Sequence, residues 1–117
     1  MTKFLTLFLF LGLTSSVIAQ NCNTIPSHFG SYEDAVAFVK RAIFKVKESV
    51  NTDRSSWIQS ASFYSCDGKV GYFIYSARGT EYIHKGMPIA VWKGFKTANS
   101  FGKYYNEYIK HRYRFNL

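Results

Sequence analysis

Between Ser31 and Val50, apolar residues recur at steps of three and four, which is the spacing of one face of an α-helix. The recurring positions are Ala35, Val39, Ala42, Ile43, Val46 and Val50. Ser31 can cap such a helix, and Glu33 and Asp34 in its first turn suit the positive end of the helix dipole. The pattern predicts one amphipathic helix of about twenty residues.

After Trp57 the apolar period changes to two, and residues 58–64 and 69–75 form two β-prone runs around Cys66-Asp67-Gly68. Asp-Gly between such runs indicates a hairpin, because glycine reaches positive φ without a steric penalty. A second turn at residues 77–80 precedes a further strand at residues 81–84.

From Pro88 to Tyr113 the pattern predicts two short helices divided by Ala98-Asn99-Ser100. Pro88 suits the first helical position and Ser100 the cap of the second helix. The predicted fold class is α+β: a small antiparallel β-meander of three or four strands, two short C-terminal helices, and the additional N-terminal amphipathic helix.

Several motifs stand in a fixed order in this second half of the chain. They are Ser55-Ser56-Trp57-Ile58, Glu81-Tyr82-Ile83-His84, Met87-Pro88 and the run from Ala98 through Ser100, Gly102 and Tyr104-Tyr105-Asn106 to Ile109. In this order and spacing the chain resembles the KTSC domain, a module found at the C-terminus of some lysyl-tRNA synthetases and as a stand-alone small bacterial protein. The resemblance implies no established activity, with RNA binding only suggested. Where the family has Tyr-x-Tyr this chain has Tyr82-Ile83-His84, which leaves any ligand contact at the second position open.

The first nineteen residues carry Lys3, an apolar run from Phe4 to Leu13, and small residues before Ala19. This is typical of a secretory signal peptide, and the run is too short to span a bilayer. We therefore expect export to the periplasm or the medium, without stable membrane insertion after cleavage. The predicted organisation is a signal peptide at 1–19, a lead-in and helix at 20–54, and a KTSC-like domain at 55–115.

Two cysteines, Cys22 and Cys66, remain after the predicted cleavage. In an oxidising compartment a disulfide between them is expected, with two unpaired thiols as the alternative. No His or Cys stands near either cysteine at zinc-ligand spacing, so neither a metal site nor a cofactor is predicted.

The chain holds 15 Lys and Arg against 7 Asp and Glu, and the excess is concentrated from Arg78 onward. Aromatic residues interleave with these cations; aromatic rings stack on unpaired bases, and cations neutralise phosphates. The candidate ligand-binding residues are Tyr75, Tyr82, His84, Lys103, Tyr104, Asn106, Lys110 and Arg112. The alternative is structural: tyrosines filling a small core and lysines solvating the surface.

The leading hypothesis for function is a non-catalytic binding module with a basic aromatic face for RNA or single-stranded DNA. The alternatives are a module that binds an exported protein or an envelope polyanion, and a small exported hydrolase or toxin. His28, His84 and His111 lack a catalytic spacing with Cys, Asp or Glu, so no catalytic residue is predicted. The ligand and the oligomeric state stay open.

Overall fold

A computed structural model describes residues 21–117. The predicted signal peptide at residues 1–19 lies outside the described residues. Within the described part, no helix is long and apolar enough to cross a membrane.

The centre of the fold is a four-stranded antiparallel sheet in the order β1-β2-β3-β4. Its strands are β1 (Val46–Val50), β2 (Ser60–Ser65), β3 (Val70–Ala77) and β4 (Thr80–Pro88). The predicted hairpin at Gly68 is confirmed, with φ at +78°, and the next turn has φ of +54° at Arg78 and +77° at Gly79. Positive φ at both central residues is the geometry of a type I′ turn, whose twist matches that of the two strands it joins.

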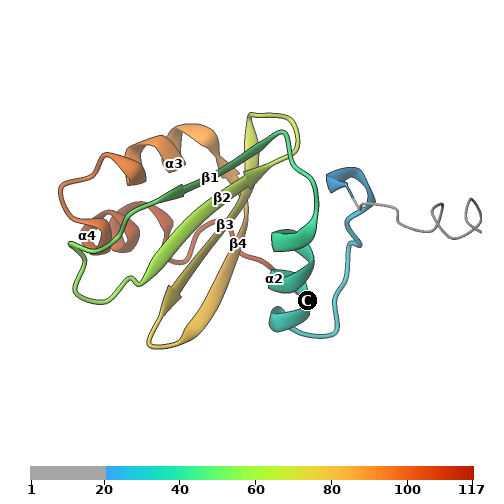
Figure 1. The fold of residues 1–117 in the computed structure, drawn as a ribbon, viewed down its shortest axis with the longest axis horizontal. Coiled ribbons are helices and arrows are strands. Elements are labelled where there is room, and N and C mark those ends of the chain that lie inside the picture. Colours follow the sequence, from blue (N-terminus) through green and yellow to red (C-terminus); the bar gives the residue numbers. More distant parts are fainter. Residues whose placement is uncertain (1–20) are drawn as a thin grey trace, which may run out of the picture.

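Three helical segments follow the sheet, as Figure 1 shows in orange and red. They are α3 (Ile89–Lys96), α4 (Phe101–Tyr104) and η2 (Tyr105–Ile109), the last a single π-helical segment. Ser100 caps α4, since its hydroxyl accepts from the Lys103 N–H at 3.2 Å. The predicted α+β class and the two C-terminal helices are thereby confirmed.

The predicted twenty-residue helix is wrong in its second half. The structure has helix α2 (Tyr32–Arg41), capped by Ser31, and then strand β1. Val46 and Val50 lie four residues apart, a spacing that places two side chains on one face of a helix and equally on one face of a strand. Both pack against the core from β1, which pairs with β2 along its length.

Each face of the sheet has its own buried core. On one face α3, α4 and η2 cover a cluster with Trp92, Phe95 and Phe73, in which the fully buried Trp92 stacks on Phe63 at 5.6 Å. On the other face α2 covers a smaller cluster with Val39. Figure 1 shows the resulting order of layers, with the sheet between α2 and the C-terminal helices.

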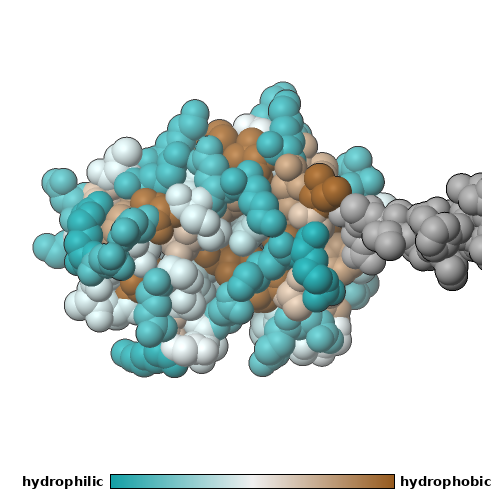
Figure 2. Space-filling view, viewed as in Figure 1, coloured by the Kyte–Doolittle hydropathy of each residue, from teal (hydrophilic) through white to brown (hydrophobic). Residues whose placement is uncertain are grey.

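Hydrophilic side chains spread over the face in Figure 2, with smaller hydrophobic areas between them. Among the described residues, large apolar side chains with over 40% of their surface exposed are Tyr32, Ile43, Val70, Tyr82, Tyr108 and Leu117. They come from different elements, so the exposed apolar surface is divided among several places.

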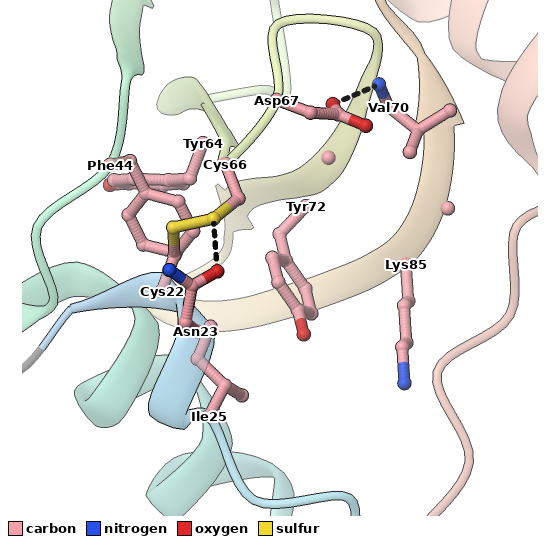
Figure 3. A pocket seen from close by; sticks show the side chains of 12 residues that line it. Cys22, Asn23, Ile25, Phe44, Tyr64, Cys66, Asp67, Val70, Tyr72 and Lys85 are labelled. Atoms are coloured by element: carbon pink, nitrogen blue, oxygen red, sulfur yellow. Dashed lines mark hydrogen bonds between the residues drawn. A yellow bond between two sulfur atoms is a disulfide. The ribbon is translucent and has the colours of Figure 1, made fainter.

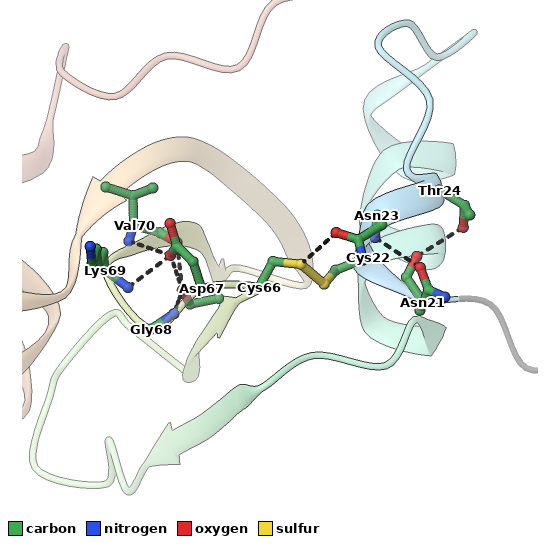
Figure 4. The surroundings of a disulfide bond; sticks show 10 residues. Asn21, Cys22, Asn23, Thr24, Cys66, Asp67, Gly68, Lys69 and Val70 are labelled. Carbon is green, nitrogen blue, oxygen red and sulfur yellow. Dashed lines mark hydrogen bonds between the residues drawn. A yellow bond between two sulfur atoms is a disulfide. The ribbon is translucent and has the colours of Figure 1, made fainter.

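The predicted disulfide between Cys22 and Cys66 is present, with the two Cα atoms 5.7 Å apart. Figure 4 shows it joining the first described residues to the loop between β2 and β3. In that loop the Asp67 carboxylate accepts from the N–H groups of Lys69 and Val70. These bonds hold the pKa of Asp67 below its ordinary value. The bridge therefore attaches the N-terminal segment to an ordered hairpin.

Candidate ligand-binding site

A groove of about 690 Å³ follows the outer edge of β4, between that strand and the segment after η2. Its lining comes from three parts of the chain: Tyr75, Tyr82, Ile83 and His84 of the sheet, Tyr105, Lys110, His111, Arg114 and Phe115 of the C-terminal segment, and Tyr32 and Glu33 of α2. Four of the eight predicted ligand-binding residues lie together here, namely Tyr75, Tyr82, His84 and Lys110.

The pairing of β3 with β4 explains why three of these side chains meet. Tyr75 stands opposite Tyr82 in the register, and Phe73 stands opposite His84. Directly opposed residues share one face of the sheet, so Tyr82 and His84 point to the side covered by η2. The Tyr75 and Tyr82 rings stack with centroids 5.0 Å apart, and Tyr82 keeps 45% of its surface exposed.

A chain of hydrogen bonds runs from the core to the groove. The Tyr75 hydroxyl donates to the Tyr105 hydroxyl at 3.0 Å, and the Tyr105 hydroxyl lies 3.1 Å from Nε2 of His84. Nδ1 of His84 lies 3.1 Å from the carbonyl oxygen of Arg112, which can only accept. In neutral His84 the proton therefore sits on Nδ1, and Nε2 accepts from Tyr105.

Burial keeps all three members of this chain uncharged near neutral pH. Desolvation lowers the pKa of His84 below its ordinary value, and the carbonyl partner only partly offsets that effect. Burial also raises the pKa of Tyr75, with a further contribution from its bond to Tyr105, and burial raises the pKa of Tyr105. The inner wall thus offers neutral donors and acceptors beside aromatic rings.

The backbone around the groove departs from regular geometry. Tyr105 opens the π-helical segment, whose wider turn is closed by the bond from the Lys110 N–H to the Tyr105 carbonyl at 2.8 Å. His111 and Tyr113 follow with φ of +65° and +52°, in the left-handed region that side chains other than glycine seldom adopt. Such segments are enriched at functional sites.

The groove has a basic and an acidic part. Lys110 and Arg114 are exposed and form no ion pair with a described residue. Glu33 and Glu81 line it as well, and Glu81 is paired with Lys40 at 2.8 Å. One of the two carboxylates is therefore neutralised within the protein, while both cations remain available to a ligand.

The other predicted residues lie elsewhere. Lys103 and Tyr104 line a separate shallow depression beside α3 and α4, where the Tyr104 hydroxyl donates to the Val91 carbonyl at 3.0 Å. Asn106 is exposed in η2, and its side chain forms no hydrogen bond with another described residue. Arg112 is exposed on the segment after η2, and it is its backbone carbonyl that contacts His84. The structure thus places four of the eight predicted ligand-binding residues in the groove and the other four outside it.

Sequence reasoning left Tyr105 and Arg114 out of the candidate site. Tyr105 stands in a pair of adjacent tyrosines, and only the packing shows that Tyr105 turns inward while Tyr104 faces the shallow depression. Arg114 reaches the groove because its backbone forms a bridge with His84 at the edge of β4. The sequence around Arg114 carries no strand signal, because Tyr113 has φ of +52° and the contact with β4 is a single bridge.

No group of three or more His, Cys, Asp and Glu suited to a metal ion occurs among residues 21–117. The fold is an α+β domain with an antiparallel sheet between helical layers, and its groove at the sheet edge is lined by aromatic and cationic side chains.

Residues 69–113 match the family model described as the KTSC domain, the family that the sequence motifs resemble. The match covers β3, β4 and the C-terminal helices, which carry most of the groove. No curated protein and no solved structure matches the chain.

Proposed function

We propose that this protein is a binding module for single-stranded nucleic acid, and that the groove along β4 holds one or two nucleotides. The observation that carries the proposal is the exposed Tyr82 ring, stacked on Tyr75, in one groove with Lys110 and Arg114. Ring and cations together match the two parts of a nucleotide, its base and its phosphate.

Tyr82 supplies the stacking platform. Its contact with Tyr75 limits its motion, while nearly half of its surface stays free for a ligand. A base that stacks on an aromatic side chain gains about 1–3 kcal/mol, and stacking tolerates any base because every base has a π-face. Sequence preference is therefore weak in this mode of binding.

Lys110 and Arg114 supply the phosphate contacts. Because only two unpaired cations line the groove, the salt dependence of binding is modest, with a logarithmic slope of about −1.4 for two neutralised phosphates. Raising salt from about 50 to about 200 mM then weakens binding about sevenfold. Glu33, the lining carboxylate that is not paired with Lys40, repels a phosphate chain and so limits the contacts that it can make.

The proposed module is non-catalytic. The imidazole of His84 is engaged at both nitrogens, by the Arg112 carbonyl and the Tyr105 hydroxyl, so neither ring nitrogen is free to take a proton from a ligand. Tyr75, Tyr105 and His84 then serve to hold in place the wall on which Tyr82 stacks.

We further propose that the mature protein acts outside the cytoplasm, after removal of residues 1–19. A disulfide is compatible with an oxidising compartment of this kind. The nucleic acid met there is extracellular, most simply DNA released from lysed cells.

The test is a fluorescence anisotropy titration of a labelled ten-nucleotide single-stranded DNA and RNA at the two salt concentrations. Tyr82→Ala should weaken binding about five- to 150-fold, the range that corresponds to one lost stacking contact. Lys110→Ala combined with Arg114→Ala should weaken binding at low salt and abolish its salt dependence.

Tyr108→Ala and Lys103→Ala are matched controls, because they remove an exposed tyrosine and an exposed lysine from the separate depression. Both should bind like the unchanged protein. Absence of binding at low salt, or equal losses in the control variants, contradicts the proposal. Binding of heparin but not of oligonucleotides would instead indicate an envelope polyanion as the ligand.

A further inference from the structure

A second cavity, of about 400 Å³, lies at the other end of the sheet from the hairpin of Arg78 and Gly79, and none of its lining residues lines the β4 groove. Its floor is aromatic: Phe44 packs on Tyr64 at 5.6 Å and on Tyr72 at 6.2 Å. Ile25 and Val70 add apolar surface, and Val70 is 46% exposed although it opens strand β3. An open, largely apolar cavity of this kind suits an apolar ligand.

One cation stands at this cavity. Lys85 lines it, is exposed, and forms no ion pair with a described residue. A bulge positions it: Gly71 pairs with Met87 but Phe73 pairs with His84, so β4 carries an extra residue here, and Gly86 has φ of +75°. Figure 3 shows Lys85 on one side of the cavity, Phe44 and the disulfide on the other, and Tyr72 between them.

The acidic residue of the cavity is already engaged. Asp67 accepts from the N–H groups of Lys69 and Val70 and from the Ser65 hydroxyl, and Figure 3 shows its carboxylate next to the Val70 N–H. These hydrogen bonds keep the carboxylate in the loop and ionised. Lys85 is then the group left to pair with an anionic ligand at this cavity.

The disulfide forms part of the wall. Cys22 and Cys66 line the cavity together with Asn23, whose Oδ1 lies 3.3 Å from the Cys66 sulfur. The segment that carries Cys22, Asn23 and Ile25 is attached to the loop between β2 and β3 by this bridge, and to the residues between α2 and β1 by the bond from the Cys22 N–H to the Ile43 carbonyl. Without the bridge this wall is held by little else.

We propose that this cavity binds a small amphiphilic monoanion, an alkyl chain or aromatic ring with one carboxylate, and that the disulfide keeps the cavity formed. The apolar part lies on the rings of Phe44 and Tyr72, and the carboxylate pairs with Lys85. The proposal is independent of nucleic-acid binding, since the two sites share no lining residue.

The probes are hexanoate, octanoate and uncharged octanol, with binding followed by the ring-proton NMR signals of Tyr64 and Tyr72 and by calorimetry. Octanoate should bind more tightly than hexanoate by about fourfold per added methylene group. Octanol should bind more weakly than octanoate. Shifts confined to other tyrosines, or no shift at millimolar octanoate, overturn the assignment.

Lys85→Met should remove the preference for octanoate over octanol, whereas Lys93→Met, at an exposed lysine of α3, should leave it unchanged. Val70→Asp, which adds a negative charge to the cavity rim without touching the buried core, should abolish octanoate binding. An unchanged preference in Lys85→Met overturns the assignment of Lys85 as the anion partner.

For the disulfide, Cys22→Ser combined with Cys66→Ser should lose octanoate binding while the ring-proton NMR signals of Tyr75 and Tyr82, in the β4 groove, keep their folded positions. Unchanged signals of these two tyrosines show that the fold is intact, so retained octanoate binding overturns the role of the bridge. A final arm uses phosphatidylglycerol vesicles: vesicle binding that octanoate does not displace overturns the assignment of a free amphiphile.

Discussion

The Tyr105 hydroxyl is the central member of a three-residue hydrogen-bond chain, so its removal should destabilise the fold more than removal of the terminal hydroxyl. It accepts from the buried Tyr75 and contacts Nε2 of His84. Tyr105→Phe breaks both bonds and leaves a hydroxyl and a ring nitrogen without a partner. Tyr75→Phe breaks one bond and still lets Tyr105 donate to His84.

The two losses can be given magnitudes. A hydrogen bond contributes about 1 kcal/mol net, and a buried polar group without a partner costs about 1–3 kcal/mol. Tyr75→Phe should therefore lower the free energy of unfolding by about 1 kcal/mol, and Tyr105→Phe by about 2–4 kcal/mol. In a domain of this size about 3 kcal/mol corresponds to a fall in Tm of roughly 12–24 °C.

The assay is equilibrium unfolding in urea, followed by tryptophan fluorescence. Trp57 is a suitable reporter, because its ring packs edge-on against Tyr75 and Tyr105 at 6.3 and 5.8 Å. The double variant, Tyr75→Phe with Tyr105→Phe, has no Tyr75 hydroxyl left without a partner. This double variant should therefore be no less stable than Tyr105→Phe alone. A larger loss of unfolding free energy in Tyr75→Phe than in Tyr105→Phe would refute the hydrogen-bond order in which Tyr75 donates to Tyr105 and Tyr105 donates to His84.

Three further outcomes are expected. Burial depresses the pKa of His84 in the folded state, so its contribution to the free energy of unfolding should be complete above about pH 6.5 and should be lost as pH drops through the folded-state pKa. In urea midpoints measured from pH 7.5 to 5, His84→Gln should flatten that fall. Gly71→Ala should cost about 3 kcal/mol or more, because the added methyl group overlaps the Tyr64 backbone carbonyl, which cannot move aside; a normal Tm would contradict this. Loss of the Cys22–Cys66 bridge, which spans 44 residues, should cost about 4 kcal/mol in chemical denaturation, and a loss below about 1 kcal/mol would show that the bridge does not constrain the unfolded chain.

The local signals in the sequence determined the hairpins, the caps and the two C-terminal helices, since each depends on neighbouring residues. Gly68 permits the positive φ of its turn wherever the strands pack, and Ser100 caps α4 through a residue three positions away. Local pattern could not divide α2 from β1, because the spacing of Val46 and Val50 fits both structures. Pairing with β2 decided in favour of the strand.

The candidate site, by contrast, was decided by tertiary structure. Composition indicated rings and cations, but only strand register placed Tyr82 beside Tyr75, and only the path of the last segment brought Arg114 to the same groove. The same packing put Lys103 in a different depression and turned Tyr105 into the core. Side chains far apart in the sequence meet through long-range strand pairing and burial. The spacing of residues along the sequence predicts neither of these.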